Sequence, residues 1–344
     1  MMRLPPFRFR APRTIEDAVA WLAESPTDTM LLAGGTDLIP NMKRRQQTPA
    51  TVIALRGIDA LKTTRNGRGF TIGAGVTLTQ IVRDDRLRAA CPGLWQAAAQ
   101  VATPHLRNMG TLGGNLCLDT RCTYYDQSLE WRKAIDFCMK KDGRTCWVAT
   151  SSPRCLAVSS TDTAPMLLAL GARVRLVSTR GERNLDVGDL YQNDGMRYLT
   201  RQADELLTDI AVPDQTGWRS AYWKLRRRGS FDFPVASAAV AVRMDAGRVA
   251  EARLALGAVA SRPLLSVRAR EILAGQPLSD DTIAAAADAA YDIAKPMDNT
   301  DFELVWRKKM VKALVTAALR EVRGDDVREL RLKIARQTLT GPGS

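Results

Sequence analysis

Two short glycine turns place the strongest constraint on how this chain can fold. The first is AGGTDL at residues 33–38, directly after the apolar segment MLL, and the second is TLGGN at residues 111–115. A strand that breaks into a glycine turn and continues as a helix presents backbone N–H groups with no side chain in the way, which suits a pyrophosphate. A single glycine pair also fits an ordinary turn. Neither pair fits G-x-G-x-x-G or the Walker A pattern, so the sequence disfavours a Rossmann or P-loop domain.

The segments around these turns mix strand-like and helical patterns without regular alternation, which predicts an α+β fold with a separate C-terminal domain. A strand that ends in VPDQTG at residues 212–217 marks the boundary between the two domains. The expected helices are 14–24 with Thr14 as N-cap, 78–85, 94–102, 161–172, 279–294 with Ser279 as N-cap, and 303–323. The expected strands are 30–33, 51–58, 70–78, 173–178, stretches of 220–245 interrupted by a turn at Gly229, and 248–260.

Charge and hydropathy narrow the possible partners. The 344 residues carry a formal net charge of +13, but the arginines and lysines are scattered and no basic ribbon interleaved with aromatics occurs. We therefore expect no nucleic-acid partner. No apolar run reaches the roughly 18 residues that span a bilayer, and the N-terminal residues lack a signal-peptide pattern. We expect no membrane partner and a cytoplasmic location.

Four of the six cysteines cluster in one stretch of the chain, at positions 122, 138, 146 and 155. In a reducing compartment such a group is more typical of metal ligands or redox groups than of disulfides. The spacing C-x15-C-x7-C-x8-C lacks the close pairs of most zinc sites and differs from the ferredoxin pattern C-x2-C-x2-C. From the residues alone, an iron–sulfur cluster, a zinc ion and buried free thiols all remain open.

Six ordered stretches give a wider resemblance: LLAGGTDLIP, IGAGVTLTQI, RNMGTLGGNL, TDTAPMLLALGA, ELLTDIAVP and YWKLRRRGSFDFPVASAAV. Over about residues 5–325 the chain resembles the FAD-binding medium subunit of the xanthine oxidase family of molybdenum hydroxylases. The resemblance implies an FAD-binding domain of two α/β subdomains at 1–215 and a C-terminal α+β domain at 216–330. Residues 331–344 would then form a tail.

The resemblance also assigns residues to the cofactor. It implies a first pyrophosphate loop, a second loop, an acidic residue that hydrogen-bonds the ribityl or adenosine part, and two residues that line the flavin. The first loop would be Ala33, Gly34, Gly35, Thr36, Asp37 and Leu38, and the second Thr111, Gly114 and Asn115, with Asp162 as the acid and Leu207 and Lys224 at the flavin. The neighbours Tyr222 and Arg226 carry no assigned role.

An insertion separates the GGN turn at 113–115 from the D-x-x-P segment at 162–165, and it includes the four clustered cysteines. In the ordinary medium subunit the two motifs follow each other almost directly. This insertion, at about 117–158, resembles the one in the 4-hydroxybenzoyl-CoA reductase branch, whose flavin subunit carries an additional [4Fe–4S] cluster. The resemblance therefore implies that Cys122, Cys138, Cys146 and Cys155 are cluster ligands. The other two cysteines, Cys91 and Cys117, are expected to be small buried apolar residues.

The expected function is an electron-transfer flavoprotein subunit that connects a [4Fe–4S] cluster, FAD and a partner's [2Fe–2S] centres. Its expected partners are a large molybdopterin subunit and a small subunit with two [2Fe–2S] clusters, in a dimer of heterotrimers, with ferredoxin as electron donor. Substrate chemistry would take place on the molybdenum subunit. One alternative is the flavin subunit of another aromatic or CoA-linked hydroxylase or dehydrogenase. Another is a zinc-stapled nucleotide-binding module with no redox role.

Overall fold

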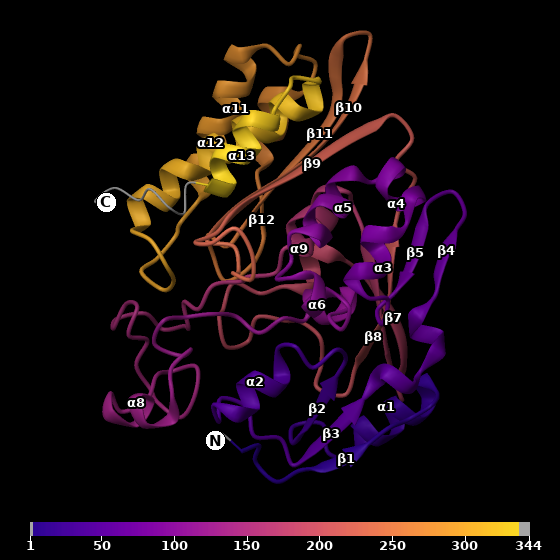
Figure 1. Cartoon of the computed structure of the whole chain (residues 1–344), viewed down its shortest axis with the longest axis vertical. Coiled ribbons are helices and arrows are strands. Elements are labelled where there is room, and N and C mark those ends of the chain that lie inside the picture. The colour runs from indigo at the N-terminus through magenta and orange to yellow at the C-terminus, as the bar shows by residue number, and fades with distance from the viewer. Residues whose placement is uncertain (1–2, 337–344) are drawn as a thin grey trace.

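The structure is a computed structural model that describes residues 3–336. It contains three separate sheets with helices packed against them, so the predicted α+β class is confirmed (Figure 1). A three-stranded sheet lies at the bottom of the view, a five-stranded sheet beside its centre, and a four-stranded sheet with its helices at the top. No helix among residues 3–336 is both long and apolar enough to cross a membrane.

The N-terminal lobe is a parallel sheet in the order β1-β3-β2, crossed by one helix. The helix α1 begins after Thr14, whose side-chain oxygen accepts the N–H of Asp17 at 3.1 Å. Its apolar face, including Leu22, is buried against the sheet. The predicted helix and its N-cap are therefore confirmed. This lobe consists of β1 (Arg8–Arg10), α1 (Ile15–Glu24), β2 (Thr29–Leu32), α2 (Leu38–Lys43) and β3 (Thr51–Ala54), followed by the 3-10 turns Leu55–Gly57 and Asp59–Lys62.

The central lobe is a five-stranded sheet in the order β4-β5-β8-β6-β7. Its middle strand β8 is the last of the five in sequence, and it pairs antiparallel with both β5 and β6. The strands are β4 (Thr64–Asn66), β5 (Phe70–Gly73), β6 (Arg173–Ser178), β7 (Gly181–Asp186) and β8 (Leu206–Val212). The helices are α3 (Leu78–Arg83), α4 (Asp85–Ala90), α5 (Pro92–Ala99), α6 (Pro104–Arg107), α7 (Leu112–Leu116) and α9 (Thr163–Ala169), with a 3-10 turn at Val187–Leu190.

The strand predicted at 70–78 ends at Gly73, earlier than expected. The following residues turn to hold the second glycine turn, because the carbonyl oxygens of Ala74 and Val76 accept the N–H groups of Gly113 and Leu112, each at 2.9 Å. The backbone hydrogen bonds that would continue the strand are thus used to position the turn.

The C-terminal domain is an antiparallel sheet in the order β12-β11-β10-β9, covered by helices. The side chain of Ser279 accepts the N–H of Thr282 at 3.2 Å, which confirms the predicted N-cap of α11. The strands are β9 (Trp218–Leu225), β10 (Ala236–Asp245), β11 (Arg248–Gly257) and β12 (Leu264–Leu265), and the helices are α10 (Val267–Leu273), α11 (Asp280–Ile293), α12 (Leu304–Arg323) and α13 (Arg328–Arg336).

Helix α13 was not expected from the sequence. It overlaps the start of the predicted tail, and Leu330 and Ile334 on it pack against the core of the C-terminal domain. Residues 337–344 of that tail lie outside the described residues.

The cysteine-rich insertion is mostly loop, with one short helix, α8 (Leu129–Ala134). It lies at the lower left of Figure 1, apart from the three sheets. Hydrogen bonds fix it on two sides. The side chain of Gln46 donates to the Tyr125 carbonyl at 2.7 Å, and the N–H of Thr123 donates to the Asn299 carbonyl at 2.9 Å. The insertion is thereby held against both the N-terminal lobe and the C-terminal domain.

Candidate functional site

The first glycine turn links β2 to the short helix α2. Gly35 has a φ of +73°, a left-handed conformation that a residue with a Cβ rarely adopts. A Cβ on Gly34 would overlap the carbonyl oxygen of Met109. The backbone of the first turn therefore packs directly on Met109 and Gly110, the two residues before the second turn, and glycine is required for that contact.

The second glycine turn forms the start of α7. The Thr111 side-chain oxygen caps this helix and accepts the N–H of Gly114 at 3.0 Å. A Cβ on Gly113 would stand 2.6 Å from the Cβ of Ala74, so this position also needs glycine for close packing. At Gly114 the neighbours are less crowded, with Thr111 Oγ1 at 3.0 Å and the Cβ of Ala33 at 3.6 Å.

Two cavities meet at these turns. One has a volume of about 450 Å³ and the other about 340 Å³, and both are lined by Ala33, Gly34, Thr111 and Gly114. The two glycine turns thus form a wall common to both cavities. This arrangement can accept a ligand with a pyrophosphate at the turns and a larger group in each cavity.

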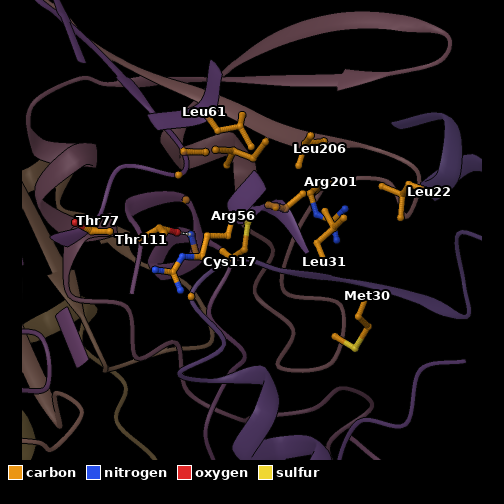
Figure 2. Close-up of a pocket in the computed structure, with 18 of the residues that line it drawn as sticks. Leu22, Met30, Leu31, Arg56, Leu61, Thr77, Thr111, Cys117, Arg201 and Leu206 are labelled. Carbon is orange, nitrogen blue, oxygen red and sulfur yellow. Dashed lines mark hydrogen bonds between the residues drawn. The ribbon is translucent and has the colours of Figure 1, made fainter. Parts of the chain in front are cut away.

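The first cavity extends towards α1 and β8. Figure 2 shows apolar side chains such as Leu22, Leu61 and Leu206 along it, with the hydroxyl of Thr111 at the glycine turn. Leu207, predicted to line the flavin, lies in the wall of this cavity. Two cationic side chains that sequence reasoning missed, Arg56 and Arg201, also line it.

The second cavity extends towards the insertion and the C-terminal domain. Gly35, Thr36, Asp37, Leu38, Asn115 and Asp162 all line it, together with the aromatic side chains of Phe231 and Phe233. The Asn115 amide oxygen accepts the hydroxyls of Thr161 at 2.8 Å and Thr163 at 2.7 Å. That oxygen therefore joins the second glycine turn to the start of α9.

Asp162 and Lys224 form a buried ion pair. Lys224 Nζ lies 3.0 Å from Asp162 Oδ1, and the Tyr222 hydroxyl donates to the same oxygen at 2.8 Å. Burial raises the pKa of Asp162 and lowers that of Lys224, while their mutual attraction opposes both shifts. Asp162 lines the second cavity, whereas Lys224 lines neither of the two. Lys224 therefore acts by holding the Asp162 carboxylate, and Tyr222, which had no assigned role, does the same.

Several residues at the turns carry no signal that sequence reasoning could use. Tyr198 lines both cavities from a loop between β7 and β8. Arg121, just before the first clustered cysteine, forms an ion pair with Asp37 of the first glycine turn.

The two cysteines outside the cluster differ in burial. Cys91 is fully buried, as expected. Cys117 is only partly buried and lines both cavities, so the expectation was wrong for Cys117. It follows the last residue of α7, where the chain turns along the cavity wall.

The four clustered cysteines come together in the fold. Cys122, Cys138, Cys146 and Cys155 are buried, form no disulfide, and line one small cavity in the insertion. Burial raises the pKa of the Cys122 thiol to about 12 and that of Cys155 to about 11. Among residues 3–336, no three His, Cys, Asp or Glu side chains form a group that could hold a metal ion. The four cysteines therefore share one cavity without forming such a group.

Comparison with known proteins decides the family. Residues 5–215 match the FAD binding domain in molybdopterin dehydrogenase, and residues 220–322 match the CO dehydrogenase flavoprotein C-terminal domain. The chain belongs to the FAD-binding medium subunits of the molybdenum hydroxylases.

The chain aligns over nearly its whole length with the medium subunits of several known complexes. The nicotinate dehydrogenase FAD-subunit of Eubacterium barkeri is 30% identical over 90% of this chain and 93% of its own length. The carbon monoxide dehydrogenase medium chain of Afipia carboxidovorans is 30% identical over 91% of this chain and 95% of its own. The solved carbon monoxide dehydrogenase of Hydrogenophaga pseudoflava superimposes with a TM-score of 0.77 at 27% identity, covering 94% of this chain and 99% of that one. The medium-subunit fold predicted from the sequence is thus confirmed, and with it FAD binding.

Proposed function

We propose that FAD lies across the two glycine turns, with its pyrophosphate over Gly34 and Gly114 and its two ends in the two cavities. The support is the shared lining of the cavities, where Gly34 and Gly114 have no side chain to occupy the space. FAD when bound supplies reversible electron transfer. The chain's own residues would bind and orient it: Asp37, Asn115 and Asp162 from one cavity, and Leu207 from the other.

We also propose that the insertion holds a [4Fe–4S] cluster on Cys122, Cys138, Cys146 and Cys155. The observation that carries this proposal is the convergence of four cysteines, well separated in sequence, on a single cavity. A cubane takes each thiolate on a different iron, so its ligands stand further apart than those around a single ion. The four cysteines line one cavity and so provide the four thiolates that a cubane needs. Backbone N–H groups near the sulfur atoms, such as that of Ala157 at 3.5 Å from Cys155 Sγ, suit thiolates as well.

On this basis the chain is the electron-transfer subunit of a cytoplasmic complex similar to 4-hydroxybenzoyl-CoA reductase. It would carry electrons from a ferredoxin to the small partner's [2Fe–2S] centres, for removal of the phenolic hydroxyl on the large molybdenum subunit. The complex would be a dimer of heterotrimers. The family membership supports the flavin role, and the cysteine cavity supports the reductase branch.

Metal analysis of cysteine variants tests the cluster. Changing any one of the four clustered cysteines to serine should lower iron by up to about four atoms per chain while FAD remains, because the glycine turns lie outside the insertion. Cys91→Ser and Cys117→Ser are matched controls and should leave iron unchanged. Wild-type iron in all four ligand variants would refute the cluster, and zinc in the intact chain would favour the nucleotide-binding module.

A second candidate function is the flavin subunit of a hydroxylating dehydrogenase. It is favoured by the relatives, which include a nicotinate dehydrogenase and carbon monoxide dehydrogenases. Activity assays on the purified complex separate the two functions. A reductase should consume 4-hydroxybenzoyl-CoA with a low-potential donor, whereas a dehydrogenase should oxidise its substrate and pass electrons out to an acceptor dye.

A further inference from the structure

A buried ion pair lies between the cysteine cavity and the second flavin cavity. Lys140 lies two residues after Cys138 and lines the cysteine cavity, whereas Asp119 lies three residues before Cys122 and lines the flavin cavity. Lys140 Nζ is 2.7 Å from Asp119 Oδ1, and the two side chains are only 6% and 5% exposed. Each cavity thus has one member of the pair in its wall.

The pair is held in one orientation by its hydrogen bonds. Lys140 Nζ has three acceptors at 2.7 Å, namely Asp119 Oδ1, the Thr120 hydroxyl and the Gly195 carbonyl, which match the three donors of an ammonium group. The other carboxylate oxygen, Asp119 Oδ2, accepts the Tyr125 hydroxyl at 3.1 Å. A buried ion pair is costly unless its remaining donors and acceptors are satisfied, and here they are.

Two aromatic rings flank the ammonium group. Lys140 Nζ lies 4.9 Å from the ring centre of Tyr125 and 5.3 Å from that of Tyr198. Tyr125 lines the cysteine cavity and Tyr198 lines both flavin cavities. The cation is therefore enclosed between the two sites and shielded from water, which makes its field stronger than at a surface.

Lys140 faces the cysteines by its position. Its side chain lines the same cavity as Cys138 and Cys155, whereas Asp119 lines the second cavity. The positive end of the pair is thus at the cysteines.

We infer that the Lys140 ammonium group, held in place by Asp119, raises the reduction potential of the cluster. This inference rests on the proposed function. Reduction adds negative charge, so a nearby cation favours the reduced form and raises a potential. Lys140 lines the cavity of the four cysteines and is its buried cation, whereas Asp119 lies on the far side of Lys140, in the wall of the second cavity. Lys140 is therefore a positioning residue for charge, and Asp119 fixes its orientation.

The test is a redox titration of the complete complex carrying Lys140→Met. The midpoint potential of the cluster, followed by electron paramagnetic resonance, should shift to a more negative value. Lys140→Arg keeps the charge and should retain the wild-type potential. Asp119→Asn removes the anion beside Lys140 and should shift the cluster potential to a more positive value. Lys141→Met is the matched control. It removes the same charge from the neighbouring residue, whose ion pair with Asp142 is partly exposed, and it should leave the cluster potential unchanged.

Iron and FAD content separate the possible outcomes. Unchanged potentials in a Lys140→Met complex with full iron and FAD would overturn the inference, as would an equal shift in Lys141→Met. If Lys140→Met does not assemble, the cluster potential of Asp119→Asn decides. Failure of Lys140→Arg and Asp119→Asn to assemble as well would make the pair a folding contact and would also overturn it. A wild-type complex without a [4Fe–4S] signal would instead refute the proposed function itself.

Discussion

At the scale of single residues, the glycines of the two turns serve different purposes. Gly34 allows the turns to pack on each other, since a Cβ there would overlap the Met109 carbonyl oxygen. A Cβ on Gly114 would meet only two side-chain atoms, Thr111 Oγ1 at 3.0 Å and the Cβ of Ala33 at 3.6 Å, so a small side-chain shift admits it, and Gly114 lines both cavities. The first glycine is needed for the fold, and the second for the ligand.

This difference predicts the behaviour of Gly114→Val. The variant should fold, yet lose FAD, because a branched side chain would fill the space that the pyrophosphate needs. Flavin absorbance per chain and the melting temperature provide the measurement. Gly34→Val is the contrasting variant and should fail to give folded protein. A soluble Gly114→Val chain with normal flavin content would show that the pyrophosphate lies elsewhere.

The Asp162–Lys224 pair predicts a large effect on stability. Lys224→Met leaves the Asp162 carboxylate buried without its cation, which should lower the free energy of unfolding by roughly 3–5 kcal/mol. Burial already raises the folded-state pKa of Asp162, and loss of Lys224 raises it further. The cost of ionising this carboxyl is absent below its unfolded pKa of about 3.9 and grows as the pH rises above it.

Thermal melts of the flavin-free chain at pH 5 and pH 8 measure this prediction. The deficit of Lys224→Met should be larger at pH 8. Lys312→Met is the control, because it breaks an exposed ion pair with Asp288, with side chains 46% and 59% exposed, and should cost about 1 kcal/mol or less. An equal, pH-independent deficit in the two variants would mean that Asp162 is not charged in the fold.

At the scale of elements, helix α4 depends on a charged N-cap. Asp84 Oδ1 accepts the N–H of Arg86 at 3.0 Å and that of Leu87 at 3.4 Å. Hydrogen bonding to the Arg86 side chain, with these backbone bonds, lowers the pKa of Asp84. The N-cap thus stabilises helix α4 both through its hydrogen bonds and through its negative charge.

Asp84→Ala should lower the free energy of unfolding by about 1 kcal/mol at neutral pH. Because the folded-state pKa is lowered, the charge stabilises the fold above the unfolded value of about 3.9 and this contribution is lost as the pH falls through the folded pKa. Denaturant titrations at pH 7 and below pH 4 should therefore show a smaller deficit in acid. Asp84→Asn keeps a neutral cap and should retain part of the stability at pH 7. An alanine deficit that grows in acid would contradict the assigned charge.

At the scale of the whole molecule, the net charge of +13 favours an acidic electron donor. With the ferredoxin proposed above as donor, the rate of electron delivery to the complex should fall steeply between low and physiological ionic strength, because screening weakens long-range attraction. Stopped-flow measurement gives the rate, and reduction by a small uncharged donor is the control that should change little. Equal salt dependence for the two donors would show that the basic charge has no role in docking.

The fold class, the helix caps at Thr14 and Ser279, and the two glycine turns could all be predicted from the sequence. These features depend on residues close together in the chain, where capping and apolar periodicity leave a readable pattern. The sequence also indicated the four clustered cysteines, because an insertion with that composition stands out within the family resemblance. Local patterns did not show that β5 would end at Gly73, because its continuation depends on hydrogen bonds to the distant turn at Leu112 and Gly113.

The residues that surround the cavities, and the contacts between those residues, became visible only in the three-dimensional structure. Tyr198 and Arg56 reach the glycine turns from distant parts of the chain, and Lys224 contacts Asp162 instead of a cavity. The Lys140–Asp119 pair joins two sites that the sequence shows only as separate motifs. Such contacts arise when strands and loops far apart in sequence are packed together, and single residues in loops carry no periodicity that would reveal their partners. Local order in this protein could therefore be predicted from neighbouring residues, whereas the contacts between its cavities depend on long-range packing and on the burial of charged side chains.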